Sequence, residues 1–232
     1  MQSLLRLPVA IEQANAVRVE WLGRGLEYGE TLSRQEELVA ARAADPVHVP
    51  ERLLLLEHAP VYTIGRTPDR SSLLDPAQLP HPLFTVGRGG QATYHGPGQL
   101  VGYPILDLNL RGRDLHRHLR AIEELVLLGL AEYGIVASRR EGLTGAWVED
   151  RKIASIGVGV RRWVSYHGFA VNVTRESLPP FQAITPCGIG GIAMTALELE
   201  ARVPVSVDAF AQTMSTIFRH HLDDVLPRTV SA

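Results

Sequence analysis

Residues 88–107 read RGGQATYHGPGQLVGYPILD, and the rest of the chain is interpreted from this stretch. A glycine-rich loop with Thr93, Tyr94 and His95 leads into an apolar segment that is typical of a buried strand. Glycine at this density indicates that the backbone turns sharply or lets another group approach closely. The stretch therefore predicts a loop that belongs to a binding site, followed by a strand of the core.

Lys152, in the segment DRKIASIG, is the single lysine among 23 lysine and arginine residues. Arginine does not release its proton in a protein, whereas lysine can. A lone lysine in an arginine-rich chain is therefore a candidate for proton transfer. The alternative is an ordinary surface lysine, which the sequence alone does not distinguish from a catalytic one.

Cys187, in TPCGIGG, is the only cysteine. A lone cysteine is commonly an inert core thiol, but Pro186, Gly188 and Gly190 place this one in a loop. A thiol in a loop is accessible to substrate, and a nearby ammonium raises the fraction of reactive thiolate. We therefore expect Cys187, Lys152 and the glycine-rich loop to form one site.

The composition is that of an ordinary globular protein, with 45% hydrophobic and 21% charged residues in a chain of 232. A net charge of −2 gives no indication of binding to nucleic acid or to a membrane surface. No apolar run approaches the roughly 18 residues of a membrane span. The single cysteine forms no internal disulfide, which favours a reducing compartment, and we expect a cytoplasmic protein.

The first residues are interpreted as an extension and not as a targeting signal. Arg6, Pro8 and Glu12 interrupt the first apolar stretch, which argues against a signal peptide. We expect residues 1–16 to be a loose N-terminal extension and residues 17–232 to form a single domain, because no repeat or linker marks a second one.

Hydrophobic periodicity predicts strands and helices that mix without a regular β-α-β alternation, so the fold class is α+β or mixed α/β. The expected strands are residues 17–21, 52–57, 83–86, 100–108, 135–137 and 146–149, an irregular strand within 58–66, and a hairpin of 152–160 and 163–173 joined at Arg161 and Arg162. The expected helices are residues 26–44, 114–133 and 194–200, and a last helix that begins at Ser206 as its N-cap.

Other chemistries are less well supported. A Cys–His pair would use His95 or His167, and the sequence leaves that choice open. The segment GGQATYHGPGQ is neither a GxGxxG nor a Walker loop, so a phosphate site has weak support. The histidine pairs 116/118 and 220/221 do not have the spacing of metal ligands, and we expect no metal and no cofactor.

Four arginines precede or begin the helix expected at residues 114–133, namely Arg111, Arg113, Arg117 and Arg120. They could bind an acidic carrier protein, but a solvated helix face is the preferred interpretation.

The chain resembles the lipoyl(octanoyl) transferase family in four motifs that follow one another in the family's order. They are RGGQATYHGPGQLVGYPILDL, a lysine in KIASIG, HGFAVNV, and a cysteine in TPCGI. The ordered set spans Arg88 to Gly188, and the similarity extends over most of the chain from about residue 17.

The resemblance implies an acyltransferase with the fold of the biotin and lipoate ligases, a mixed sheet flanked by helices. Such enzymes take an octanoyl or lipoyl group from acyl carrier protein. They place it on a lysine of an apo lipoyl domain, as in the E2 subunits of 2-oxoacid dehydrogenases and in the glycine cleavage H protein. We expect a monomer.

The resemblance also implies roles for particular residues. Cys187 matches the nucleophile that becomes an acyl-thioester, and Lys152 matches the residue that lowers the thiol pKa and handles the proton. The acyl-contacting segments fall on Arg88, Gly89, Gly90, Gln91, Ala92, Thr93, Tyr94 and His95, on Ser155, Ile156 and Gly157, and on Gly168, Phe169 and Ala170. Tyr94 is expected to line an acyl tunnel. His95 either orients the reacting groups or braces the loop.

Covalent catalysis by a cysteine suits this transfer, because it splits the exchange into two steps and lets two carrier proteins use one site in turn. Lys152 would deprotonate Cys187 and later take a proton from the acceptor amine. The nearest rival function is an ATP-dependent lipoate or biotin ligase, which has no need of a nucleophilic thiol. A binding module without turnover is a second rival.

Overall fold

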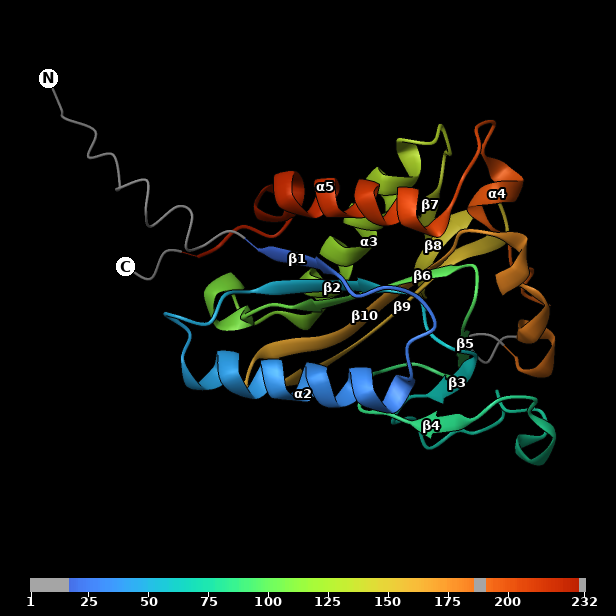
Figure 1. Cartoon of the computed structure of the whole chain (residues 1–232), viewed down its shortest axis with the longest axis horizontal. Helices are drawn as coiled ribbons and strands as arrows, with labels where there is room; N and C mark the ends of the chain where they lie inside the picture. The colour runs from blue at the N-terminus through green and yellow to red at the C-terminus, as the bar shows by residue number, and fades with distance from the viewer. Residues whose placement is uncertain (1–16, 186–190, 230–232) are drawn as a thin grey trace, which may run out of the picture.

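A seven-stranded mixed sheet forms the centre of the computed structural model, which describes residues 17–185 and 191–229 (Figure 1). Its strand order is β1-β2-β6-β10-β9-β8-β7, formed by Arg18–Trp21, Arg52–Leu56, Gln99–Ile105, Val164–Asn172, Arg151–Arg161, Leu143–Val148 and Ser138–Arg140. β1 is parallel to β2, and every other neighbouring pair is antiparallel.

A smaller sheet of three strands packs beside the large one, in the order β4-β3-β5, formed by Leu83–Thr85, Val61–Ile64 and Thr93–His95. β3 is parallel to β4 and antiparallel to β5. The glycine-rich loop connects β4 to β5, so its place in the molecule is set by this small sheet.

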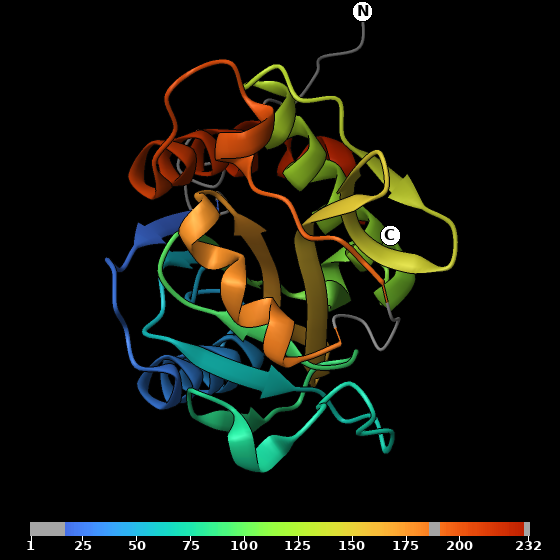
Figure 2. The ribbon, with the colours of Figure 1, turned by 90° about the vertical axis from the view of Figure 1, so that its right-hand side faces the viewer.

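Helices cover both faces of the large sheet, as predicted. α2 (Tyr28–Ala44) packs on one face against β6 and β10. α3 (Leu115–Ala131) and α5 (Val207–Val225) pack against each other on the opposite face (Figure 2). A short helix, α4 (Leu197–Glu200), precedes α5. The mixed α/β fold class is confirmed.

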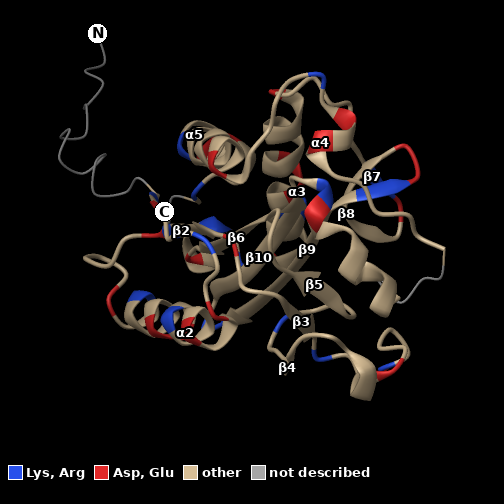
Figure 3. Ribbon diagram, turned by 45° about the vertical axis from the view of Figure 1, so that its right-hand side comes forward, with Lys and Arg blue, Asp and Glu red and all other residues tan. Residues whose placement is uncertain are grey.

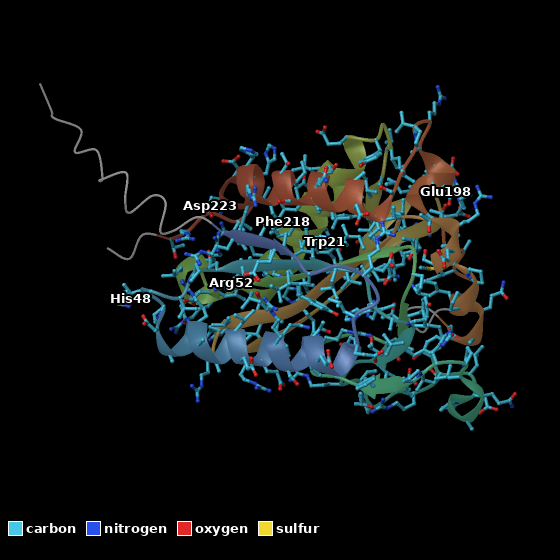
Figure 4. All side chains as sticks on the ribbon, viewed as in Figure 1. Trp21, His48, Arg52, Glu198, Phe218 and Asp223 are labelled. Atoms are coloured by element: carbon cyan, nitrogen blue, oxygen red, sulfur yellow. The ribbon has the colours of Figure 1, made fainter. Side chains whose placement is uncertain are left out.

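The N-cap predicted at Ser206 is confirmed, and Asp114 forms a second one. Ser206 caps α5 by accepting a hydrogen bond from the backbone N–H of Ala209, and Asp114 caps α3 in the same way. Phe218 lies between α5 and the sheet, with its ring 5.8 Å from that of Phe169 in β10 (Figure 4). The main core of the protein is therefore the layer between α3, α5 and the large sheet.

Two short segments differ from the sequence-based expectation. Residues 93–95 form strand β5, whereas the glycines around them predicted a loop, because β3 offers them an antiparallel partner. Residues 135–137 form no strand, and β7 begins three residues later. Ile135 instead donates its N–H to Leu130 at the end of α3 and packs in the core.

The β9–β10 hairpin turns one residue later than predicted, at Arg162 and Trp163. Both residues have positive φ, at 52° and 62°. A two-residue hairpin loop of this hand needs positive φ at both central positions, and here it forms without glycine.

Arg111 is buried, which corrects its assignment to a solvated surface. Its side chain is 0% exposed and forms ion pairs with Glu51 and with Asp223 of α5. Arg120, by contrast, is 54% exposed and pairs with the buried Glu123.

Candidate active site

A cavity of about 330 Å³ lies between the glycine-rich loop, α3 and the β9–β10 hairpin. Its walls are formed by Tyr28 of α2, residues 88–93 and His95, Val101 and Tyr103 of β6, Leu115 and Leu119 of α3, residues 142–144, Lys152 and residues 155–158 of β9, and residues 167–170 of β10. The three segments that the sequence predicted to contact an acyl group, and the predicted lysine, are thus brought to one cavity. Tyr94 does not line it.

Arg88 fixes the shape of the glycine-rich loop from inside. Its guanidinium donates to the carbonyls of Gly89 and Gln91 at 2.9 and 3.0 Å, and to the carbonyl and hydroxyl of Thr63 in β3 at 3.0 and 2.8 Å. A Cβ on Gly65 would lie only 2.3 Å from the carbonyl oxygen of Gly90. The loop is therefore held against the end of β3 by a buried cation and by a close backbone approach.

Two facing glycines let this loop approach the hairpin. Gly157 of β9 and Gly168 of β10 are partners in the antiparallel register. A Cβ on Gly157 would lie 3.1 Å from Arg88 Cδ, and a Cβ on Gly168 would lie 2.3 Å from the carbonyl oxygen of Gly102. Larger residues at either position would push the loop or the neighbouring strand out of place.

His95 braces the loop, which is one of the two roles considered for it. Burial, together with the nearby His58, holds the pKa of His95 well below its usual range, so the ring is neutral. Its Nδ1 lies 2.8 Å from Gln99 Oε1 and its Nε2 lies 3.4 Å from Thr63 Oγ1. With both ring nitrogens occupied, His95 holds β5 between β3 and β6.

The same network continues to the backbone of Lys152. The Gln99 amide donates to Asn172 Oδ1 at 3.0 Å, and the Asn172 amide donates to the carbonyl of Thr195 at 3.0 Å. The N–H of Thr195 in turn donates to the carbonyl of Lys152 at 2.9 Å. A continuous chain of hydrogen bonds therefore links the glycine-rich loop to the lysine strand.

Lys152 reaches the cavity from a buried position, with 2% of its surface exposed. Its Nζ lies 5.3 Å from the centre of the Trp147 ring, a position that forms a cation–π contact whenever the lysine carries a proton. Gly145 gives it room, since a Cβ there would lie 2.7 Å from Lys152 Cε. Neither neighbour was expected from the sequence, although Trp147 and Gly145 both lie within seven residues of the lysine.

Glu123 fixes Gly145 in turn. The carboxylate of Glu123, 1% exposed, accepts a hydrogen bond from the N–H of Gly145 at 3.0 Å and pairs with Arg120 and Arg139. Arg139 belongs to β7, the edge strand whose basic residues are visible in Figure 3. The strand that flanks the lysine is thereby tied to α3.

Cys187 lies outside the described residues, so its contact with Lys152 stays a prediction. The described residues on either side of it are anchored at the site. The N–H of Thr185 donates to the carbonyl of Ser72 at 2.8 Å, and the Ser72 hydroxyl accepts from the N–H of Ala92 in the glycine-rich loop at 3.1 Å. On the other side, the N–H of Lys152 donates to the carbonyl of Ala193 at 2.8 Å.

Tyr94 packs in a separate apolar cluster, contrary to its expected place along an acyl tunnel. Its ring lies 5.4 Å from that of Tyr62 and 5.9 Å from that of Phe181. Strand alternation explains this, because Thr93 and His95 on either side of it face the cavity.

A group of buried aromatic residues at the cavity was missed by the sequence analysis. His58 Nδ1 lies 3.0 Å from the carbonyl of Leu26 and so carries the proton, which leaves Nε2 to accept from the Tyr103 hydroxyl at 2.6 Å. Burial lowers the pKa of His58 to about 4 and raises that of Tyr28 to about 12. These groups stay neutral near pH 7. Isolated aromatic residues in predicted core elements carry no sequence signal for a site.

Within residues 17–185 and 191–229, no group of three or more His, Cys, Asp or Glu side chains could hold a metal ion. Among those same residues no helix combines the length and the apolarity that crossing a membrane requires.

The chain matches the lipoyl protein ligase A/B catalytic domain over residues 27–219. It is 50% identical over 202 residues to the octanoyltransferase of Geobacter metallireducens, and the alignment covers 87% of this chain and 92% of that protein. The chain belongs to this family. The octanoyltransferase of Synechococcus elongatus is 45% identical over 208 residues, covering 85% of this chain and 88% of that one. The family members that it resembles at this level are acyltransferases, and octanoyl transfer is its activity.

Solved structures of lipoate and biotin protein ligases share the fold. A lipoate protein ligase from Thermoplasma acidophilum superposes with a TM-score of 0.64 at 17% identity, covering 91% of this chain and 84% of that one. A biotin protein ligase from Aquifex aeolicus gives a TM-score of 0.53 at 14% identity, covering 90% and 72%. The ligase fold is therefore confirmed, while the octanoyltransferases are the relatives at high identity.

Proposed function

We propose that the chain transfers an octanoyl group from acyl carrier protein to the lysine of an apo lipoyl domain through a thioester on Cys187. The observation that carries this proposal is the anchoring of the described chain around residues 186–190. On one side Thr185 is bonded to Ser72, whose hydroxyl is bonded to the glycine-rich loop. On the other side Ala193 is bonded to the backbone of Lys152, which lines the cavity.

The first half-reaction forms the acyl-enzyme. Lys152, as the free amine, takes the proton of the Cys187 thiol, and the thiolate attacks the carbonyl carbon of the carrier thioester. The bond from carbonyl carbon to carrier sulfur breaks, and the carrier leaves as a thiol after it receives the proton held by Lys152. Neither ATP nor a metal takes part, because one thioester replaces another.

The second half-reaction releases the product. The acceptor lysine, as a free amine, attacks the thioester carbonyl and forms an amide, and the bond to the Cys187 sulfur breaks. Lys152 takes the proton that the attacking nitrogen loses and returns it to the thiolate. The acyl chain lies meanwhile against the apolar wall of Leu119, Ile156 and Phe169.

The nature of the acceptor is supported by a structural relative. The Thermoplasma acidophilum ligase was solved as part of a lipoylation system together with its E2 lipoyl domain. We propose E2 lipoyl domains and the glycine cleavage H protein as acceptors for this chain as well. The reaction is proposed to take place in the cytoplasm and to need one copy of the chain.

The test is to incubate the protein with octanoyl acyl carrier protein in the absence of ATP and to measure its intact mass. The expected result is an octanoyl adduct that maps to Cys187 and moves to an apo lipoyl domain when that domain is added. Cys187→Ser is the matched control and should form no transferable adduct. Transfer that appears only with ATP and free octanoate would establish a ligase, and donor binding without turnover would establish a binding module.

A further inference from the structure

The cavity is polar at the end that lies away from Lys152. His167 of β10 is the register partner of Val158 of β9, and Val158 stands six positions beyond Lys152. At a rise of about 3.3 Å per residue, His167 and Lys152 are separated by about 20 Å along the hairpin. Both side chains line the cavity, so its two ends have different chemistry.

His167 presents two hydrogen-bonding atoms that have no partner. The residue is 2% exposed, and neither Nδ1 nor Nε2 forms a hydrogen bond with the described residues. Its backbone is held at a positive φ of 56° while its N–H donates to Gln35 Oε1 of α2 at 2.8 Å. A buried ring in an uncommon conformation, with both nitrogens unsatisfied, points to a ligand or a bound water inside the cavity.

The ring is neutral near pH 7 and can both donate and accept. Burial, with the positive charges of Arg88 and Arg66 nearby, lowers the pKa of His167 to about 3. A neutral imidazole has one N–H donor and one acceptor nitrogen. The Tyr103 ring stands beside it at 6.4 Å between ring centres and also lines the cavity.

An octanoyl chain is too short to reach this end. An extended eight-carbon chain spans about 9 Å and a twelve-carbon chain about 14 Å at standard bond lengths. With the lysine side chain at the other end taking up part of the separation, the longer chain reaches His167 and the shorter one stops before it. In the part of the cavity beyond the end of an octanoyl group, the two ring nitrogens of His167, unpartnered among the described residues, supply polar partners for water.

We propose that His167 sets the upper limit of acyl chain length by polarity, so that apolar chains long enough to reach it are rejected while chains that end in a hydroxyl are accepted. The inference rests on the proposed function, because it places the reacting carbonyl at the Lys152 end. A long apolar chain expels the water that satisfies the imidazole and leaves a buried donor and acceptor unpaired. That loss corresponds to roughly 5- to 150-fold in affinity. A terminal hydroxyl replaces the water and avoids the loss.

The experiment compares octanoyl, dodecanoyl and 12-hydroxydodecanoyl acyl carrier protein as donors. The wild-type protein should transfer the 12-hydroxydodecanoyl group with a kcat/KM about tenfold above that of the dodecanoyl group. His167→Leu should invert this ratio, whereas His167→Asn should preserve it, because asparagine keeps a hydrogen-bonding side chain and tolerates positive φ. Ratios within one variant are independent of how much of it is active.

A binding measurement separates failure of this inference from failure of the proposed function. Calorimetry with free dodecanoate and 12-hydroxydodecanoate should show the same preference in the wild type and its inversion in His167→Leu. Equal affinities, or a preference that survives in His167→Leu, would overturn the role of His167. Absence of octanoyl transfer would overturn the proposed function alone, since the two binding constants are obtained without turnover.

Discussion

Lys152 enters the cavity through a space that exists only because residue 145 is glycine. Gly145 has φ at 129°, and a Cβ there would lie 2.4 Å from the carbonyl oxygen of Ala154 as well as 2.7 Å from Lys152 Cε. The Ala154 carbonyl oxygen belongs to the backbone of β9 and has no freedom to move away. A Cβ at position 145 would therefore displace the lysine side chain. The position of the Lys152 side chain thus depends on the absence of a Cβ at residue 145.

Gly145→Ala should therefore reduce octanoyl transfer at least about tenfold and lower the free energy of unfolding by about 2–4 kcal/mol. Gly134→Ala is the matched control, because Gly134 also has positive φ, at 72°, but a Cβ there meets nothing within 4 Å. The control should lose only about 1 kcal/mol of stability and keep its transfer rate. Equal rates for the two variants would show that the lysine does not need this space.

Lys152→Arg tests the proton-transfer role directly. Arginine keeps the positive charge but does not act as a base, so the variant should fold and lose transfer by at least about 100-fold. Arg151→Lys, one residue earlier on β9 and partly exposed, should leave transfer unchanged. Transfer rates and thermal unfolding curves of both variants are the measurements. Substantial transfer by Lys152→Arg would mean that Lys152 contributes only its positive charge and not proton transfer.

Among the elements, a buried charge cluster joins the start of β2, the 3-10 turn η2 (Leu108–Arg111) and the end of α5. Glu51, fully buried, receives 2.7 Å contacts from both Arg111 and Arg228. Asp223, labelled near the end of α5 in Figure 4, pairs with the other side of Arg111. This cluster closes the molecule at the end opposite α4.

Glu51→Gln should destabilise the protein by about 3 kcal/mol, because it removes the buried carboxylate that pairs with Arg111 and leaves that buried charge only the exposed Asp223 as an acidic partner among the described residues. Glu20→Gln, which removes partly exposed ion pairs with Arg34 and Arg52, should change stability by no more than about 1 kcal/mol. Urea unfolding of the two variants measures the difference. Similar losses of unfolding free energy in both variants would mean that the buried ion pair contributes no more to stability than the partly exposed one.

The pH dependence of this element has a definite sign. Burial by itself would raise the pKa of Glu51, but the hydrogen bond and charge of Arg111, helped by Arg228, hold it below its ordinary value of 4.5. The contribution of the pair is therefore complete above about pH 4.5 and is lost as the pH falls through the lowered pKa of the folded state. Glu51→Gln should lack this acid-dependent part.

At the scale of the whole molecule, the sequence predicted the fold class and most of the cavity wall but not the contacts inside it. Glycine density marked residues 88–95, and the rarity of lysine marked Lys152. Tyr28, Tyr103 and Glu123 went unnoticed, because each stands in an element whose pattern only requires it to be buried. Their roles arise from packing between α2, β6 and α3, which no local pattern encodes. Cys187 lies beyond the described residues and remains a sequence prediction.

Four buried histidines make the stability of the whole protein sensitive to mild acid. Burial lowers the pKa of His58 and His118 to about 4, that of His167 to about 3, and that of His95 well below its usual range. The folded state therefore stays unprotonated while the unfolded chain binds protons below about pH 6.5. Stability is complete above that pH and falls below it, by up to about 1.4 kcal/mol per pH unit for each histidine.

Urea unfolding between about pH 7 and about pH 5 should show this loss at a constant m value. His118→Leu should reduce the slope by about one proton, because both nitrogens of this buried ring lack partners among the described residues and it lies outside the cavity. His48→Gln is the control, since the His48 side chain is 82% exposed and stands far from the core in Figure 4; its slope should match that of the wild type. If the dependence of unfolding free energy on pH is unchanged in His118→Leu, the interior admits a charged imidazole. The neutral states assigned to His95 and His167 in the cavity would then also be wrong.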